Sequence, residues 1–265
     1  MAANDWDPDV YARFAEMRAR PFWDLSDGID TTAPIDSMVD LGCGSGELTR
    51  ALADRLRVGR AIGVDASPAM LARTAEHTNA HCRFESGDIA TWTSERLVDL
   101  IVANASLQWV PDHPAVIERW SAQLASDGRL AIQVPTNADH PSHTCSAAVA
   151  EREPFRSAMG GAPPADPVAD NVLRPEMYTE LLHDIGFADP HVRLVVYPQV
   201  MPSSQAVVEW TSGTSLTRFF SALPDELHEP FVDAYRTELL AAIGDRAPYL
   251  YTFKRILINA RRPAT

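Results

Sequence analysis

The stretch Val39-Asp40-Leu41-Gly42-Cys43-Gly44-Ser45-Gly46 decides how the rest of the chain is interpreted. A short apolar strand ends there, and three alternate glycines then allow a tight turn into a helix. Such a turn lets a ligand approach the backbone, while the first N–H groups of the helix remain available as donors. A dinucleotide-binding turn needs a third glycine at position 47, where the chain has Glu47, whose charge repels a pyrophosphate. The spacing therefore disfavours a dinucleotide and suits a ligand without phosphates.

Polar residues also follow the next three expected strands. Asp65 ends the second strand, residues 87–89 follow the third, and residues 104–109 follow the fourth. In an open α/β sheet, ligands bind at the carboxyl ends of the strands, so these groups are expected to lie along one edge. A carboxylate at Asp65 suits two ribose hydroxyls, and Asp88 with a backbone amide can bind an adenine edge. Both acids are also plausible helix caps.

From residue 37 onward, short apolar strands alternate with helices. This alternation indicates an α/β fold with a parallel sheet that helices cover on both faces. The expected strands are 38–41, 61–64, 82–85, 97–103 and 129–135, and the expected helices are 47–56, 67–77 and 112–124.

The pattern changes after Pro135. Residues 136–173 are rich in proline, which predicts a long loop that acts as a lid or cap. The expected elements beyond it are a helix at 175–186, a strand at 192–200, further helices within 203–243 and a closing strand at 253–260. At the other end of the chain, residues 5–26 have the pattern of an amphipathic helical arm, and residues 27–37 are a polar connector.

Composition excludes several classes of protein. The 265 residues carry 23 basic and 36 acidic side chains, a formal net charge of −13. That field repels nucleic acids and anionic membranes, so neither is an expected partner. Residues 1–10 lack the apolar core of a signal peptide, and no apolar run has the length of a membrane span. Three widely spaced cysteines suit reduced thiols, which predicts a cytoplasmic protein.

Four motifs together resemble the class I methyltransferases: DLGCGSGELT (40–49), GVD (63–65), GDI (87–89) and NASLQW (104–109). The resemblance implies S-adenosylmethionine as the cofactor and a Rossmann-like, doubly wound, mostly parallel sheet with an antiparallel closing strand. It implies that the glycine turn contacts the methionine part and that the backbone near Asn104 accepts the cofactor's amino group. The implied cofactor site comprises Asp40, Gly42, Gly44, Asp65, Ala66, Asp88, Ile89, Asn104 and Ala105.

Longer stretches are similar to one family of these enzymes, the trans-aconitate 2-methyltransferases. They are WDPDVYARFAEMRARP (6–21), ASPAML (66–71), NASLQWVPDH (104–113), MPSSQAVVEW (201–210) and FKRILINARR (253–262). The resemblance implies methylation of a carboxylate of trans-aconitate to a monomethyl ester. Tyr11, Arg20, Trp109 and Arg255 are the expected substrate-binding residues, with Arg174 and Arg218 as weaker candidates. Trp109 is equally plausible as a core aromatic residue.

The whole chain is expected to form one methyltransferase domain. Residues 27–135 would bind the cofactor, while 136–173 and 201–245 would be helical cap insertions for the substrate. A substrate carboxylate is already ionised at neutral pH, so no catalytic base is expected, and the task of the enzyme is alignment and exclusion of water.

Alternatives remain open at this point. His140, His143 and Cys145 lie close in sequence but lack a fourth metal ligand, so no metal is expected. The acceptor could be another small carboxylic acid, or the chain could bind S-adenosylmethionine without catalysis. A nicotinamide-dependent oxidoreductase is the third alternative, which Glu47 disfavours.

Overall fold

The computed structural model describes residues 19–264, and the chain divides there into two compact units. The first unit contains residues 19–135, 171–195 and 255–264, and the second contains 136–170 and 196–254. The predicted arm at 5–26 lies largely outside the described residues, but its end is helical at 19–26. Across residues 19–264 the structure contains no helix with the length and apolar character that a membrane span requires.

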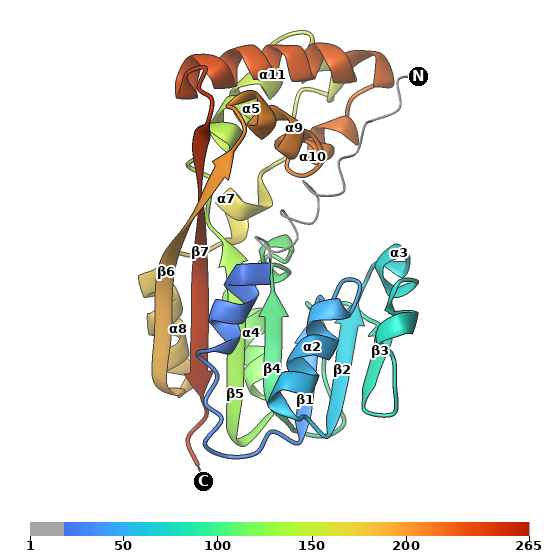
Figure 1. Ribbon diagram of the computed structural model, residues 1–265, viewed down its shortest axis with the longest axis vertical. Coiled ribbons are helices and arrows are strands. Elements are labelled where there is room, and N and C mark those ends of the chain that lie inside the picture. Colours follow the sequence, from blue (N-terminus) through green and yellow to red (C-terminus); the bar gives the residue numbers. More distant parts are fainter. Residues whose placement is uncertain (1–18, 265) are drawn as a thin grey trace. The chain divides into compact units, whose positions relative to one another are not determined.

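A seven-stranded sheet runs through the molecule in the order β3-β2-β1-β4-β5-β7-β6 (Figure 1). The pairs from β3 to β5 are all parallel, and β7 joins β5 in the antiparallel direction. The strands are β1 (Ser37–Leu41), β2 (Arg60–Asp65), β3 (Cys82–Ser86), β4 (Val98–Asn104), β5 (Leu124–Pro135), β6 (Ala188–Met201) and β7 (Tyr249–Arg261).

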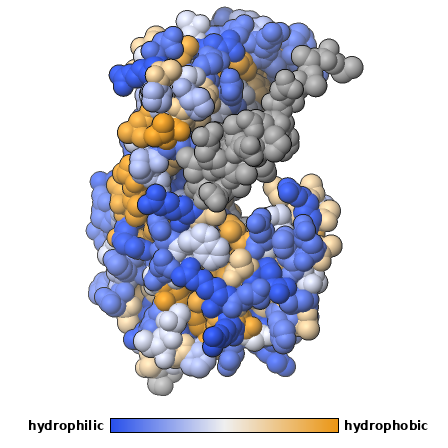
Figure 2. Space-filling view, in the orientation of Figure 1, coloured by the Kyte–Doolittle hydropathy of each residue, from blue (hydrophilic) through white to orange (hydrophobic). Residues whose placement is uncertain are grey.

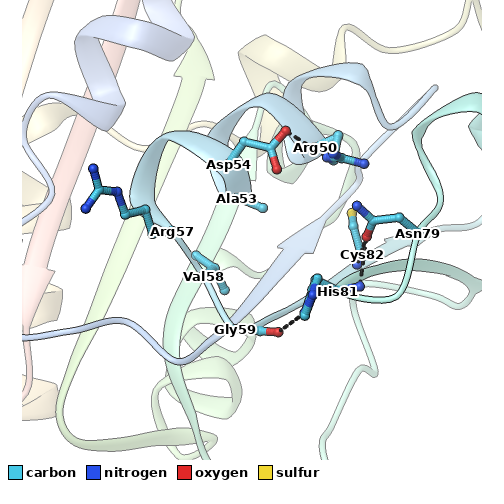
Figure 3. A pocket seen from close by; sticks show the side chains of 9 residues that line it. All are labelled: Arg50, Ala53, Asp54, Arg57, Val58, Gly59, Asn79, His81 and Cys82. Atoms are coloured by element: carbon cyan, nitrogen blue, oxygen red, sulfur yellow. Dashed lines mark hydrogen bonds and ion pairs between the residues drawn. The ribbon is translucent and has the colours of Figure 1, made fainter.

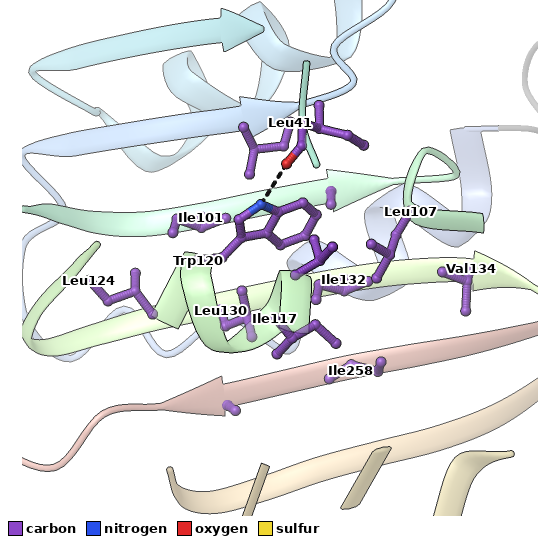
Figure 4. Close-up of a cluster of buried hydrophobic side chains, with 14 of the residues drawn as sticks. Leu41, Ile101, Leu107, Ile117, Trp120, Leu124, Leu130, Ile132, Val134 and Ile258 are labelled. Atoms are coloured by element: carbon purple, nitrogen blue, oxygen red, sulfur yellow. Dashed lines mark hydrogen bonds between the residues drawn. The ribbon is translucent and has the colours of Figure 1, made fainter. Parts of the chain in front are cut away.

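Helices cover both faces of the first unit's sheet. On one face, α2 (Glu47–Leu56) and the helical residues 19–26 pack on Met38, Val102 and Leu257. On the other face, α4 (His113–Ser121) and α8 (Pro175–Ile185) pack on β4, β5 and β7. Trp120 of α4 is fully buried in this second cluster (Figure 4). Its Nε1–H donates to the Ile89 carbonyl at 2.9 Å. The predicted α/β fold with a mostly parallel, doubly wound sheet and an antiparallel closing strand is confirmed.

The second unit is mainly helical, in agreement with the helical insertions expected at 136–173 and 201–245, and it corrects the prediction that 136–173 is a long loop. Prolines begin helices there, because at the first helical position a missing N–H costs nothing. The helices with residues in this unit are α5 (Pro141–Ala150), α6 (Phe155–Ala158), α7 (Pro167–Asn171), α9 (Gln205–Ser212), α10 (Thr217–Phe220) and α11 (His228–Ile243), with a 3₁₀ turn at Asp225–Leu227. Phe231 of α11 contacts Phe155 and Phe219, with ring centroids 5.2 and 5.0 Å apart.

Two further expectations need correction in detail. The helix predicted at 67–77 is broken into α3 (Pro68–Leu71) and a 3₁₀ turn at Thr74–His77, and residues 89–91 form a turn instead of a short helix.

The three cysteines are free and buried. Hydrophilic residues cover most of the face shown in Figure 2.

Candidate active site

The turn after β1 is built around Gly42, where only glycine fits. Its φ of +88° is unfavourable for other residues, and an added Cβ would lie 2.2 Å from the Cβ of Ser106. Ser106 approaches because its Oγ donates to the Leu41 carbonyl at 2.6 Å. The loops that follow β1 and β4 are thus held together at the carboxyl edge of the sheet.

Gly44 also has a positive φ, +57°, but it faces open space: a Cβ there would meet no atom within 4 Å. Its N–H donates to Oδ2 of Asp65 at 2.8 Å, and Oδ1 of Asp65 accepts from the Ser67 N–H, also at 2.8 Å. Asp65 therefore fixes the turns after β1 and β2, while Ala66 beside it is exposed. A half-buried carboxylate oxygen has further lone pairs, so this role leaves Asp65 able to bind a ligand hydroxyl.

Asp40 lies deeper than its neighbours, at 3% exposure. Its Oδ2 accepts from the Thr49 hydroxyl of α2, and its Oδ1 is buried without a hydrogen-bond partner. Burial raises the pKa of Asp40 to about 6, against the lowering effect of the Thr49 hydrogen bond, and the charge of Asp65 raises it further. Asp40 is therefore protonated at a higher pH than an ordinary aspartate, although it remains mostly ionised at neutral pH.

Asp88 and Ile89 follow β3 at the same edge. Asp88 is exposed, and its Oδ1 accepts from the Ala90 N–H at 2.9 Å, which stabilises the local turn. Ile89 is buried, with its carbonyl bonded to Trp120. The alternative role of Asp88 as a helix cap is wrong, because no helix begins there.

Asn104 ends β4, and Ala105 follows it with a φ of +52°. The Ala105 N–H donates to the Gln133 carbonyl of β5 at 2.9 Å, and the Ala105 carbonyl accepts from Gln108 Nε2 at 2.6 Å. Three side-chain atoms in this region are buried without a hydrogen-bond partner: Oδ1 of Asn104, Oε1 of Gln108 and Nε2 of Gln133. Sequence reasoning missed Gln108 and Gln133; the available signal was one polar residue inside the apolar run 130–134.

The candidate substrate residues differ in their surroundings. Arg20 is exposed on the helical segment 19–26, and Arg255 is half-buried on β7, in register with Pro135 of β5. Trp109 is 68% exposed, so its alternative role as a core aromatic residue is wrong. Tyr11 lies outside the described residues.

The two weaker arginine candidates already have acidic partners. Arg174 is exposed and forms an ion pair with Glu176 at 3.0 Å. Arg218, in the second unit, contacts Asp166 at 3.1 Å, and Asp166 also accepts from His143 Nδ1 at 2.7 Å. Within residues 19–264, no three histidine, cysteine, aspartate or glutamate side chains are grouped closely enough to hold a metal ion.

A cavity of about 350 Å³ lies elsewhere in the first unit (Figure 3). Its lining includes Arg57 after α2 and the amino ends of β2 and β3, at Gly59 and Cys82. Parallel strands place ligand sites at their carboxyl ends, so this cavity does not belong to the candidate site.

Solved structures share this architecture. A geranyl diphosphate C-methyltransferase from Streptomyces coelicolor A3(2) superposes with a TM-score of 0.56 at 17% identity, covering 98% of this chain and 86% of that one. The YcgJ protein from Bacillus subtilis superposes with a TM-score of 0.57 at 15% identity, covering 92% and 100%. At these identities the likeness shows the fold.

Sequence comparison identifies the class and then the family. Residues 11–192 match the family described as "Methyltransferase domain", so the chain belongs to the methyltransferases. A trans-aconitate 2-methyltransferase of Deinococcus radiodurans is 39% identical over 97% of this chain and 98% of its own length. One from Paracidovorax citrulli is 40% identical over 98% and 100%. Within the methyltransferases, the chain belongs to the trans-aconitate 2-methyltransferase family.

Proposed function

We propose that this chain transfers the methyl group of S-adenosylmethionine to a carboxylate oxygen of trans-aconitate, giving a monomethyl ester. The observation that carries the proposal is similarity over nearly the full length to relatives that bear this name. The open face of Gly44 and the unpartnered Oδ1 of Asn104 are consistent with a ligand at this edge of the sheet.

The residues that would hold the cofactor lie on four successive strand ends. Asp65 would accept from the ribose hydroxyls, and Asp88 with the Ile89 N–H would bind the adenine edge. Gly42 and Gly44 would let the methionine part approach the backbone, and the backbone at Asn104 and Ala105 would accept from its amino group. Asp40, buried near the end of β1, and Ala66, exposed next to Asp65, would complete the cofactor site. When bound, the cofactor supplies a methyl group on a positively charged sulfur.

The chain needs no general base for this reaction, because a carboxylate acceptor is ionised well below neutral pH. Its residues align the carboxylate oxygen with the methyl carbon and keep water away from that oxygen. Alignment alone can lower such a barrier by about 7–11 kcal/mol. We therefore expect kcat to be nearly constant between about pH 7 and 9 at saturating substrate.

The other carboxylates of the substrate need fixed positive charges, because the chain's net charge of −13 opposes binding of an anion. Arg20 and Arg255 are the proposed cations, and Trp109 and Tyr11 the proposed neighbouring aromatic contacts. A guanidinium group suits this role because it binds a carboxylate with two parallel hydrogen bonds.

A turnover assay with labelled cofactor tests the proposal directly. Trans-aconitate should be methylated faster than cis-aconitate, citrate or simple dicarboxylates. The proposal fails if trans-aconitate gives no ester, or if another acid is a markedly better acceptor.

Arginine variants test the substrate contacts. Arg20→Gln and Arg255→Gln should each raise KM for trans-aconitate by about 10–150-fold, because each removes a charged hydrogen-bonding pair. Binding of S-adenosylhomocysteine, measured by calorimetry, should stay unchanged. Arg174→Gln is the matched control, since Arg174 is exposed and paired with Glu176. An unaltered KM would exclude the arginine concerned from the site.

A further inference from the structure

Gln133 and Asn104 form a register pair between β5 and β4 at the carboxyl edge of the sheet. Both lie on the sheet face that carries Val102, Ala131 and Leu257, because alternate residues of a strand share a face. Gln133 is only 2% exposed, and its Nε2 has no hydrogen-bond partner. The pair thus places a buried, unused donor beside Asn104, whose buried Oδ1 is an unused acceptor.

The sheet itself gives no reason for a glutamine at this position. Its neighbours Ile132 and Val134 are apolar and fully buried, and the Gln133 backbone carbonyl already accepts from Ala105. Buried polar side chains in folded proteins nearly always have a partner, because an unpaired donor keeps the full cost of losing water. A ligand that carries an acceptor would supply the missing partner of Nε2.

The order of the strands indicates which ligand that is. Along the edge, the proposed cofactor residues follow β3, β2, β1 and β4, and β7 with Arg255 lies on the far side of β5. Gln133 on β5 therefore stands between the last cofactor strand and the proposed substrate arginine. The geometry points to Gln133 as a substrate-binding residue, which donates from Nε2 to the methyl-accepting carboxylate. This inference rests on the proposed function.

A neutral donor suits the reacting carboxylate better than a cation does. A single N–H bonded to one oxygen restrains the position of the carboxylate and leaves the other oxygen with its charge for attack. A guanidinium bound to both oxygens would hold back that charge. In the reaction one C–O bond forms and the S–CH₃ bond breaks, with its electron pair remaining on sulfur, so Gln133 neither gains nor loses a proton. The unpartnered atom of Asn104, Oδ1, is a hydrogen-bond acceptor. It cannot bind a carboxylate oxygen, which is also an acceptor, and would instead face the cofactor.

The decisive variant is Gln133→Met, which keeps the size and removes the donor. We expect kcat/KM for trans-aconitate to fall about 10–150-fold, as when one hydrogen bond to a charged group is lost. The Kd of S-adenosylhomocysteine should stay within about twofold, and the melting temperature should not fall, because an unsatisfied buried donor has been removed. If Gln133 only stabilised the fold, the melting temperature would fall and kcat/KM would stay unchanged.

Gln123→Met is the matched control in the same unit. The Gln123 side chain accepts from the Ser94 N–H at 3.0 Å, just before β5 begins and away from its carboxyl end. This variant should lose stability and keep kcat/KM.

Gln133→Glu gives a second, pH-dependent readout, which remains available if the methionine variant does not fold. At about pH 8 the new carboxylate repels the substrate, and activity should fall below that of Gln133→Met. As the pH is lowered, the protonated side chain regains an O–H donor, so activity relative to the wild type should rise.

The outcomes separate the two proposals. If the wild-type protein methylates trans-aconitate and Gln133→Met does so equally well, the inference is wrong and the proposed function stands. If the variant instead weakens S-adenosylhomocysteine binding in proportion to its loss of activity, Gln133 contacts the cofactor and the inference is again wrong. A wild-type protein inactive on trans-aconitate overturns the proposed function itself.

Discussion

The carboxyl edge of the sheet and the Asp166 cluster of the second unit (His143, Asp166 and Arg218) differ in how their charged and polar groups are paired. At the edge, Gly44 faces open space, and Asn104 and Gln133 hold buried polar atoms without partners. In the second unit, Asp166 accepts from His143 and pairs with Arg218. The edge therefore has polar groups available for a ligand, whereas the charged groups of this cluster pair with one another, although Nε of Arg218 is also buried without a hydrogen-bond partner.

The same contrast separates residues that look alike in the sequence. Gly42 and Gly44 belong to one turn, yet the first is enclosed and the second is open. Arg174 and Arg218 were equal candidates for the substrate, yet the first pair is exposed and the second is largely buried. Variants at these positions therefore measure whether each residue stabilises the fold or binds a ligand.

Gly42→Ala should have the largest effect on stability. The substitution forces an L-residue to a φ of +88° and places a methyl group 2.2 Å from the Cβ of Ser106. We expect a loss of about 3–5 kcal/mol in the free energy of unfolding, measured with urea, and loss of cofactor binding. A near-native midpoint would mean that the loop after β4 moves away easily, which would contradict the tight edge described above.

Arg218→Met should have the next largest effect on stability. It leaves the Asp166 carboxylate, 12% exposed, without its guanidinium partner, although His143 and the Val168 N–H still donate to it, and we expect a loss of about 2–3 kcal/mol. Arg174→Met is the matched control: its side chain is 75% exposed, and its removal should change stability by less than about 0.5 kcal/mol. Equal effects would show that burial does not distinguish the two ion pairs. A large rise in KM for Arg218→Met would move Arg218 into the substrate site.

Asp166 should also make the protein sensitive to acid. Burial raises the pKa of Asp166, but the His143 hydrogen bond and the charge of Arg218 outweigh it and lower the pKa to about 2, from 3.8. Since the folded-state pKa is the lower one, the stabilisation is complete above about pH 4 and is lost as the pH falls towards 2. It amounts to about 2 kcal/mol. Unfolding of the wild type and of Asp166→Asn, compared at several pH values, should show a smaller acid slope in the variant.

Gly44→Ala and Gly160→Ala should have the smallest effects on stability, and their comparison tests ligand binding at Gly44. Both glycines have a positive φ, +57° and +71°, and neither would gain a contact within 4 Å from a new Cβ. Each variant should therefore lose about 1 kcal/mol of stability. Only Gly44→Ala should weaken S-adenosylhomocysteine binding, by at least about tenfold, because its methyl group would occupy space that the ligand needs. Similar binding by both variants would place the ligand away from Gly44.

Features that depend on neighbouring residues were predictable from the sequence. Strand ends and the turns that follow them are local, so the alternation of strands and helices up to β5 and the position of Asp65 at a strand end follow from short motifs. A helical cap was expected at 136–173, but its individual helices were not located, because the prolines there indicated a long loop, although at Pro141 and Pro167 proline begins a helix.

Features that depend on distant pairing were not predictable in this way. The significance of Gln133 comes from its register with Asn104, which is set only when β4 and β5 pair. Likewise, Arg218 differs from Arg174 because the fold brings Asp166 to it, far along the chain. A single sequence gives the identity of such side chains but not their partners.

The three buried thiols allow the two units to be followed separately in time. Cys43 and Cys82 belong to the first unit and Cys145 to the second, and burial raises the pKa of all three. Only the thiolate reacts with disulfide reagents, so labelling requires each segment to open and expose its sulfur. Mass-resolved labelling rates would then report the opening frequency of each unit within one native molecule. Cys43 lies between Gly42 and Gly44, so slower labelling of this thiol alone would register an occupied turn without any measurement of catalysis.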